Sequence, residues 1–139
     1  MAPRTWTPAT VPEIPLPRGA RDPGAAVRVT RAGRWAALAR VRGEVDLSTA
    51  PAVERALASV LAGPDLLVLV VDLSEVDFMA AAGLTALVHT REQARVRAVD
   101  LRLVATTRAV LRPLDITGLR QTFRVHADTR VLLAPHVRA

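Results

Sequence analysis

The 139-residue sequence contains no cysteine, no lysine and no tyrosine, and it has only two tryptophans and two phenylalanines. Without cysteine, disulfides, thiolate metal sites and cysteine nucleophiles are excluded. With few aromatic side chains, the core must be built from leucine, valine and alanine. No apolar run approaches the ~20 residues of a membrane-spanning helix, and the N-terminus has no apolar signal core. We therefore expect a cytoplasmic protein with no membrane segment.

The net charge is +6, and every basic side chain other than histidine is an arginine. A positive surface could bind nucleic acid through its phosphates. The arginines are scattered from Arg4 to Arg138, however, and no aromatic residues alternate with them to stack on bases. A GC-rich genome explains the excess of arginine and alanine together. Nucleic-acid binding therefore stays a less favoured alternative.

Proline divides the chain into two parts, because residues 1–24 hold six of the ten prolines. This composition predicts an extended, flexible N-terminal arm. Residues 25–139 are long enough for one domain with a core of ordinary size. We therefore predict an arm over 1–24 and a single folded domain over 25–139.

Hydrophobic periodicity predicts alternating strands and helices in that domain. The first helix begins at a Thr49 cap, or alternatively at Ser48, and ends before Gly63. Pro113 should bend or end the third helix. We expect strands over 26–30, 35–42, 66–71, 101–105 and 123–126, a polar turn over 72–79, and helices over 81–95, 108–114 and 130–133. Because helical crossovers join parallel strands, this order predicts an α/β sandwich. Its mixed, mostly parallel sheet has about five strands, with about four helices.

The sequence offers little for catalysis. The three histidines are too widely spaced to form a metal site, and no serine lies in a G-x-S-x-G turn. Asp72, Glu75 and Asp77 form a carboxylate cluster that could serve acid–base catalysis or bind a cation. Acids spaced in this way after a strand more often form turns. We therefore predict no enzyme activity, no catalytic residues, no metal and no cofactor.

Five segments share their order and spacing with a known domain family. They are Gly43 to Ala50 (GEVDLSTA), Leu69 to Met79 (LVVDLSEVDFM), Gly83-Leu84, Ile116 to Leu119 (ITGL) and Phe123 to Val125 (FRV). Together they resemble the STAS domain of the anti-sigma factor antagonists, over about residues 26 to 134. The resemblance implies a STAS-like fold and a regulatory module that binds another protein. The implied partner is an anti-sigma factor, a protein with a histidine-kinase-like ATPase fold.

The chain departs from this family at its switch site, which reads Asp-Ser-Ser/Thr-Gly-Leu and is phosphorylated on the first serine by the partner kinase. The corresponding residues here are Ala80, Ala81, Ala82, Gly83 and Leu84. Ala81 stands at the acceptor position and has no oxygen to phosphorylate. The resemblance therefore implies a module that cannot be switched at this position. Either it binds its partner constitutively, or it has lost recognition by the kinase.

The resemblance also implies a face that meets the partner. Its residues are those before the first helix and those at the start of the second: Glu44, Asp46, Thr49, Met79, Ala80, Ala81, Ala82, Gly83 and Leu84. Two local alternatives stay open: Asp46 only accepts hydrogen bonds from loop N–H groups, and Gly83 only permits close packing. An alternative function is a scaffold in which STAS modules assemble with themselves, as a homo-oligomer.

Overall fold

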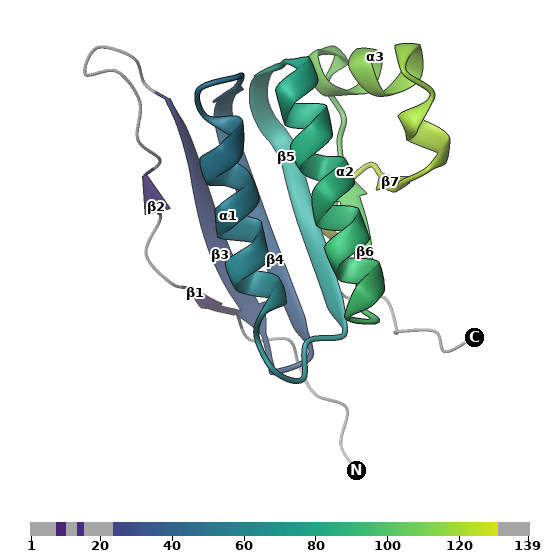
Figure 1. The fold of residues 1–139 in the computed structure, drawn as a ribbon. Helices are drawn as coiled ribbons and strands as arrows, with labels where there is room; N and C mark the ends of the chain where they lie inside the picture. Colours follow the sequence, from purple (N-terminus) through teal and green to yellow (C-terminus); the bar gives the residue numbers. More distant parts are fainter. Residues whose placement is uncertain (1–7, 11–13, 16–23, 131–139) are drawn as a thin grey trace.

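The computed structural model describes residues 8–10, 14–15 and 24–130. Figure 1 shows a sheet with its helices gathered on one face. The elements in chain order are β1 (Pro8–Thr10), β2 (Ile14–Pro15), β3 (Ala25–Ala32), β4 (Ala36–Val45), α1 (Ala50–Leu61), β5 (Val68–Met79), α2 (Ala81–Val96), β6 (Asp100–Val104), α3 (Arg108–Ile116), a 3-10 turn η1 (Leu119–Gln121) and β7 (Arg124–His126).

The sheet is mixed, as predicted. β3 and β4 form an antiparallel hairpin closed at Gly33, whose positive φ of 68° suits a tight turn. β4, β5, β6 and β7 then follow in that order, each parallel to its neighbour. β1 and β2 lie antiparallel to β3 along its other edge. The remainder of the predicted arm lies outside the described residues, so its flexibility stays a prediction.

The main core lies between the sheet and its helices. α1 and α2 lie side by side over the strands, and α3 covers the end of the sheet near the start of α2 (Figure 1). Leu57 of α1, Leu69 and Val71 of β5, and Leu103 of β6 are completely inaccessible to solvent. A second, smaller cluster includes Val70 on the opposite face of the sheet. The core contains mostly leucine, valine and alanine, with a single phenylalanine, as the composition predicted.

β5 is longer than predicted. Residues 72–79 were expected to form a turn, but they continue the strand to Met79. β4 and β5 pair with two one-residue irregularities, after Asp72 and after Val76, where β5 has one residue more than β4. At the first, Asp72 Oδ1 accepts hydrogen bonds from Ser74 N at 3.0 Å and Ser74 Oγ at 2.6 Å. These are the bonds of a local turn, and here they form inside a bulged strand.

The helices also differ from the prediction in two details. α3 runs through Pro113 to Ile116, so this proline does not end the helix, and the other alternative, a bend at Pro113, stays a prediction. Thr117 Oγ1 donates to the Pro113 carbonyl at 2.7 Å and supports the last turn. Residues 24–130 contain three α-helices rather than about four. The predicted helix over 130–133 lies almost wholly outside the described residues. Within the described part, no helix is long and apolar enough to cross a membrane.

Candidate partner-binding site

α2 begins at the end of the sheet where β4 and β5 finish. Ala80 is its N-cap and has an extended backbone with φ −83° and ψ 171°. It offers no side-chain acceptor to the free N–H groups of the first turn. Two backbone bonds fix the junction instead: Ala80 N donates to Val45 O at 2.9 Å, and Gly83 N donates to Ala80 O at 2.9 Å. The helix start is therefore held by β4 and by its own backbone, without a polar cap.

Position 81 lies on the surface. Ala81 is exposed and Ala82 is partly exposed, whereas Gly83 and Leu84 are buried. The nearest hydroxyl within α2 belongs to Thr85, whose Oγ1 donates to the Ala81 carbonyl at 3.1 Å. A side chain at position 81 would thus be accessible to an enzyme or a partner. In this chain that side chain is a methyl group.

The loop between β4 and α1 is organised by one carboxylate. Asp46 Oδ1 accepts hydrogen bonds from Ser48 N at 3.0 Å, Ser48 Oγ at 2.9 Å and Thr49 N at 3.1 Å. Thr49 is the N-cap of α1, as predicted, and is completely buried. Its Oγ1 donates to Glu44 O at 2.8 Å and not to the helix. Asp46 therefore accepts hydrogen bonds from loop N–H groups and also from the hydroxyls of Ser48 and Thr49, so it does not bond N–H groups alone. Its contact with a partner stays a prediction.

Two large apolar side chains are exposed at this same end. Leu47, in the loop, is 81% exposed, and Phe78, near the end of β5, is 51% exposed. Phe78 lies beside the start of α2 because it comes two residues before the Ala80 cap and pairs with Glu44 of β4. Leu47 follows two residues after Val45, which pairs with Met79. The predicted site did not include either residue. Single exposed apolar side chains are common, but apolar side chains gathered together and bordered by polar residues mark protein-binding surfaces.

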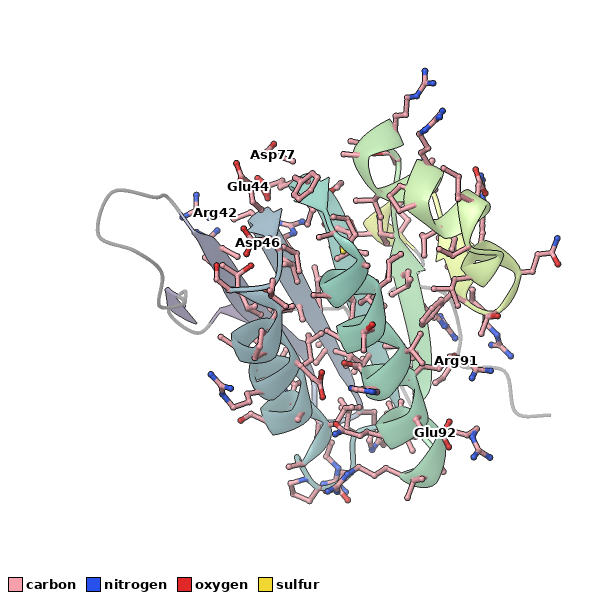
Figure 2. All side chains as sticks on the ribbon, turned by 45° about the horizontal axis from the view of Figure 1, so that its top comes forward. Arg42, Glu44, Asp46, Asp77, Arg91 and Glu92 are labelled. Atoms are coloured by element: carbon pink, nitrogen blue, oxygen red, sulfur yellow. The ribbon has the colours of Figure 1, made fainter. Side chains whose placement is uncertain are left out.

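Acidic side chains border this apolar surface. Figure 2 shows Glu44, Asp46 and Asp77 gathered where α1 and α2 begin, with Arg42 beside them. The chain as a whole carries a net charge of +6, whereas three of these four labelled side chains are acidic. A partner with basic groups around an apolar centre would be electrostatically complementary.

The structure separates the predicted site residues into two layers. Ala81 is exposed, and Glu44, Asp46, Ala80 and Ala82 are partly exposed. Thr49, Met79, Gly83 and Leu84 are buried beneath them. Met79 and Leu84 stand immediately before the cap and four residues after it, the two positions of a hydrophobic staple, and both belong to the main core. The buried residues can position the surface, and only the outer residues can touch a partner.

Gly83 has a packing role. A Cβ at this position would contact Met79 Sδ and lie 2.8 Å from Val45 Cγ1. The absence of a side chain therefore lets α2 approach β4 closely. This geometry supports the packing alternative for Gly83.

The carboxylate cluster after the strand has a structural explanation. Asp72 is buried, and its second oxygen forms an ion pair with Arg40 at 3.3 Å. Glu75 and Asp77 are exposed on β5. No group of three or more histidine, aspartate and glutamate side chains in the described residues could hold a metal ion. The local hydrogen bonds and the ion pair account for Asp72 without catalysis.

Comparisons with known proteins agree with these observations. The family model for the STAS domain matches residues 28–131. An anti-sigma-F factor antagonist of Mycobacterium tuberculosis, RsfB, is 38% identical over 89 residues, which are 64% of this chain and 71% of the relative. A second, RsfA, is 34% identical over 103 residues, which are 71% of this chain and 78% of the relative.

Solved structures give the same fold. An anti-sigma factor antagonist from Mycobacterium paratuberculosis superposes with a TM-score of 0.71 at 33% identity, covering 79% of this chain and 92% of the other. Unphosphorylated SpoIIAA superposes with a TM-score of 0.64 at 12% identity, covering 76% and 91%. The predicted architecture is therefore confirmed.

Proposed function

The chain belongs to the STAS domain family, and we propose that it is a non-enzymatic anti-sigma factor antagonist that cannot be switched at position 81. Its relatives are named for antagonising an anti-sigma factor. The observation that carries the proposal is the exposure of Leu47, Phe78 and Ala81 at one end of the molecule. The partner would be a kinase-like ATPase of the anti-sigma class, and the protein would work in the cytoplasm, where sigma factors act.

The exposed apolar side chains would supply the binding energy. Leu47 and Phe78 can each lose their remaining contact with water when a partner covers them, which is the main favourable term in association. Well-packed residues at the centre of an interface often contribute about 2 kcal/mol or more. The surrounding acids, Glu44, Asp46 and Asp77, would orient the partner and increase the rate of encounter.

Alanine at position 81 gives the proposed direction of regulation. A phosphoserine would add about −1.5 to −2 charges, and a partner covering that dianion would have to remove its water. The methyl group of Ala81 resembles an unmodified serine in size and neutrality. The surface would therefore remain competent to bind whatever a kinase does at this position.

The test is a binding titration of the full chain against the anti-sigma-F factor for which the M. tuberculosis relatives are named. We expect Leu47→Ala and Phe78→Ala each to weaken binding at least about tenfold. Val96→Ala is a matched control, because Val96 is 78% exposed at the other end of α2. Equal effects of all three variants would contradict the proposed surface.

The same samples separate the alternative function. A large assembly of the chain alone in size-exclusion chromatography, with no complex formed on adding the anti-sigma factor, would favour a STAS scaffold. A monomer that forms a stoichiometric complex would support the antagonist. Thermal melting of each variant checks that lost binding is not lost folding.

A further inference from the structure

We propose that Ser48 is a phosphorylation site, and that it takes over at this surface the switching role that Ala81 cannot perform. The inference rests on the proposed function, because it assigns a regulatory step to the same surface. Ser48 lies in the loop between β4 and α1, next to the exposed Leu47. Figure 2 shows Asp46, two residues before it, at the end of the molecule where α2 begins.

The Ser48 hydroxyl is accessible and already oriented. The residue is exposed, and its Oγ donates a hydrogen bond of 2.9 Å to Asp46 Oδ1. The Ser48 backbone N–H donates to the same oxygen at 3.0 Å, so the residue is held at two points. A carboxylate that accepts the hydroxyl proton can also receive it when the oxygen attacks an electrophile.

Neighbouring hydroxyls at this end are less suited. Thr49 is completely buried, and its Oγ1 donates to the Glu44 carbonyl. Thr85 is exposed, but its Oγ1 donates to the Ala81 carbonyl inside the helix. Both hydroxyls donate to backbone carbonyls, and Thr49 Oγ1 also lies 3.2 Å from Asp46 Oδ1. The exposed Ser48 hydroxyl instead donates to the Asp46 carboxylate.

The chemical step is a phosphoryl transfer from ATP bound by a partner kinase. A bond forms between Ser48 Oγ and the γ-phosphorus as the bond from that phosphorus to the bridging oxygen of ADP breaks. The electron pair of the broken bond leaves with ADP. The hydroxyl proton passes to Asp46 Oδ1 and then to water.

The product would change the loop and its charge. The Oγ proton would be lost, so its hydrogen bond to Asp46 could no longer form. A dianion would then lie beside the Asp46 carboxylate and next to Leu47. Like charges repel, and a partner seated on Leu47 would have to desolvate the phosphate. We expect phosphorylation to weaken partner binding at least about tenfold.

The experiment incubates the full chain with the same anti-sigma-F factor and radiolabelled Mg-ATP, followed by peptide mapping. We expect label on Ser48 in the native sequence and none in Ser48→Ala. Ser48→Ala combined with Ala80→Asp and Ala81→Ser restores the family's acceptor, and its labelling shows that the kinase reaches this surface. Absence of label from Ser48 in the native sequence overturns the inference, whichever other residue is labelled.

Binding of unphosphorylated variants provides the second readout. Ser48→Glu should bind the anti-sigma factor at least about tenfold more weakly than Ser48→Gln, which has the same size without the charge. Equal binding by these two variants overturns the switching role. Failure of the native chain to bind at all would refute the proposed function itself. Binding without label on Ser48 would refute only this inference.

Discussion

Replacing Gly83 with alanine tests whether the start of α2 is fixed by close packing against β4. An added Cβ would contact Met79 Sδ, lie 2.8 Å from Val45 Cγ1 and lie 3.3 Å from Val45 O. Met79 is flexible and can move its sulfur. Val45 is β-branched and stiff, and its carbonyl accepts the Ala80 N–H at 2.9 Å. The contact with Val45 therefore decides how much stability the added methyl group removes.

Two opposing contributions, helix propensity and crowding of the core, determine how much Gly83→Ala changes the free energy of unfolding. Alanine in place of glycine favours a helix by about 1 kcal/mol. Inserting a methyl group into a packed core costs about 1–3 kcal/mol. Since the nearest stiff atoms lie well inside normal contact distance, we expect the cost to exceed the gain. Gly83→Ala should lower the free energy of unfolding by about 1–2 kcal/mol.

Urea unfolding of four proteins measures this effect: the native sequence, Gly83→Ala, Val45→Ala and the double variant. In the Val45→Ala background the Cγ1 contact is gone, so Gly83→Ala should cost about 1 kcal/mol less than in the native background. Unchanged or increased stability of the Gly83→Ala single variant would refute the packing argument. Strict additivity in the double variant would show that Val45 is not the obstacle.

Three further predictions concern charge. Ala81→Glu should weaken binding to the anti-sigma-F factor at least about tenfold relative to Ala81→Gln, while the acid near the helix N-terminus slightly raises the melting temperature. Asp100→Ala should lower the free energy of unfolding in urea by about 3 kcal/mol, because Arg102 is buried and donates to Asp100 Oδ2 at 2.8 Å. Asp100→Asn should lower that free energy by less. The hydrogen bond from Arg95 lowers the pKa of Glu92. Any stabilisation of the fold by this pair is therefore present above the ordinary pKa of glutamate and is lost as the pH falls through the lowered value. Carboxyl NMR should find the lowered pKa of Glu92, and 1 M salt should raise that pKa.

Local signals were sufficient for most of the fold. Thr49 is the helix cap that the sequence predicted, and α2 begins at Ala81, where the sequence predicted its start. The hairpin and the alternation of strands and helices also follow from periodicity and turn residues. These features depend on residues close together in the chain, so a single sequence contains the information for them.

The length of β5 could not be predicted in the same way. Its buried residues towards the helices are Val71, Leu73, Val76 and Met79, with spacings of two, three and three. A strand without irregularities has a spacing of two. Each bulge adds one residue and changes the spacing to three, which in the sequence looks like a turn. Only pairing with β4, which is distant in sequence, keeps this segment extended.

The exposed apolar residues were missed for a related reason. Leu47 and Phe78 lie in largely apolar or mixed segments, where an apolar side chain is usually assumed to point inward. Phe78 directly precedes the buried Met79, however, and consecutive strand residues face opposite sides. Given the bulged register, the exposure of Phe78 follows. The partner-facing surface therefore depended on the sheet pairing and could not be read from local sequence.

The missing polar cap of α2 allows stability and function to be separated. Ala80 has the extended backbone of an N-cap without an acceptor, so an aspartate there could bond free N–H groups of the first turn. We expect Ala80→Asp alone to raise the free energy of unfolding by about 1 kcal/mol, with Ala80→Leu as the control without an acceptor. Such a gain, measured by urea unfolding, would mean that the fold tolerates an acid here and does not require alanine. The alanines would then reflect the binding surface and its regulation rather than packing. If Ala80→Asp were no more stable than Ala80→Leu, an acceptor at position 80 would add nothing to the bonds between α2 and β4. Stability and function could then not be told apart at this position.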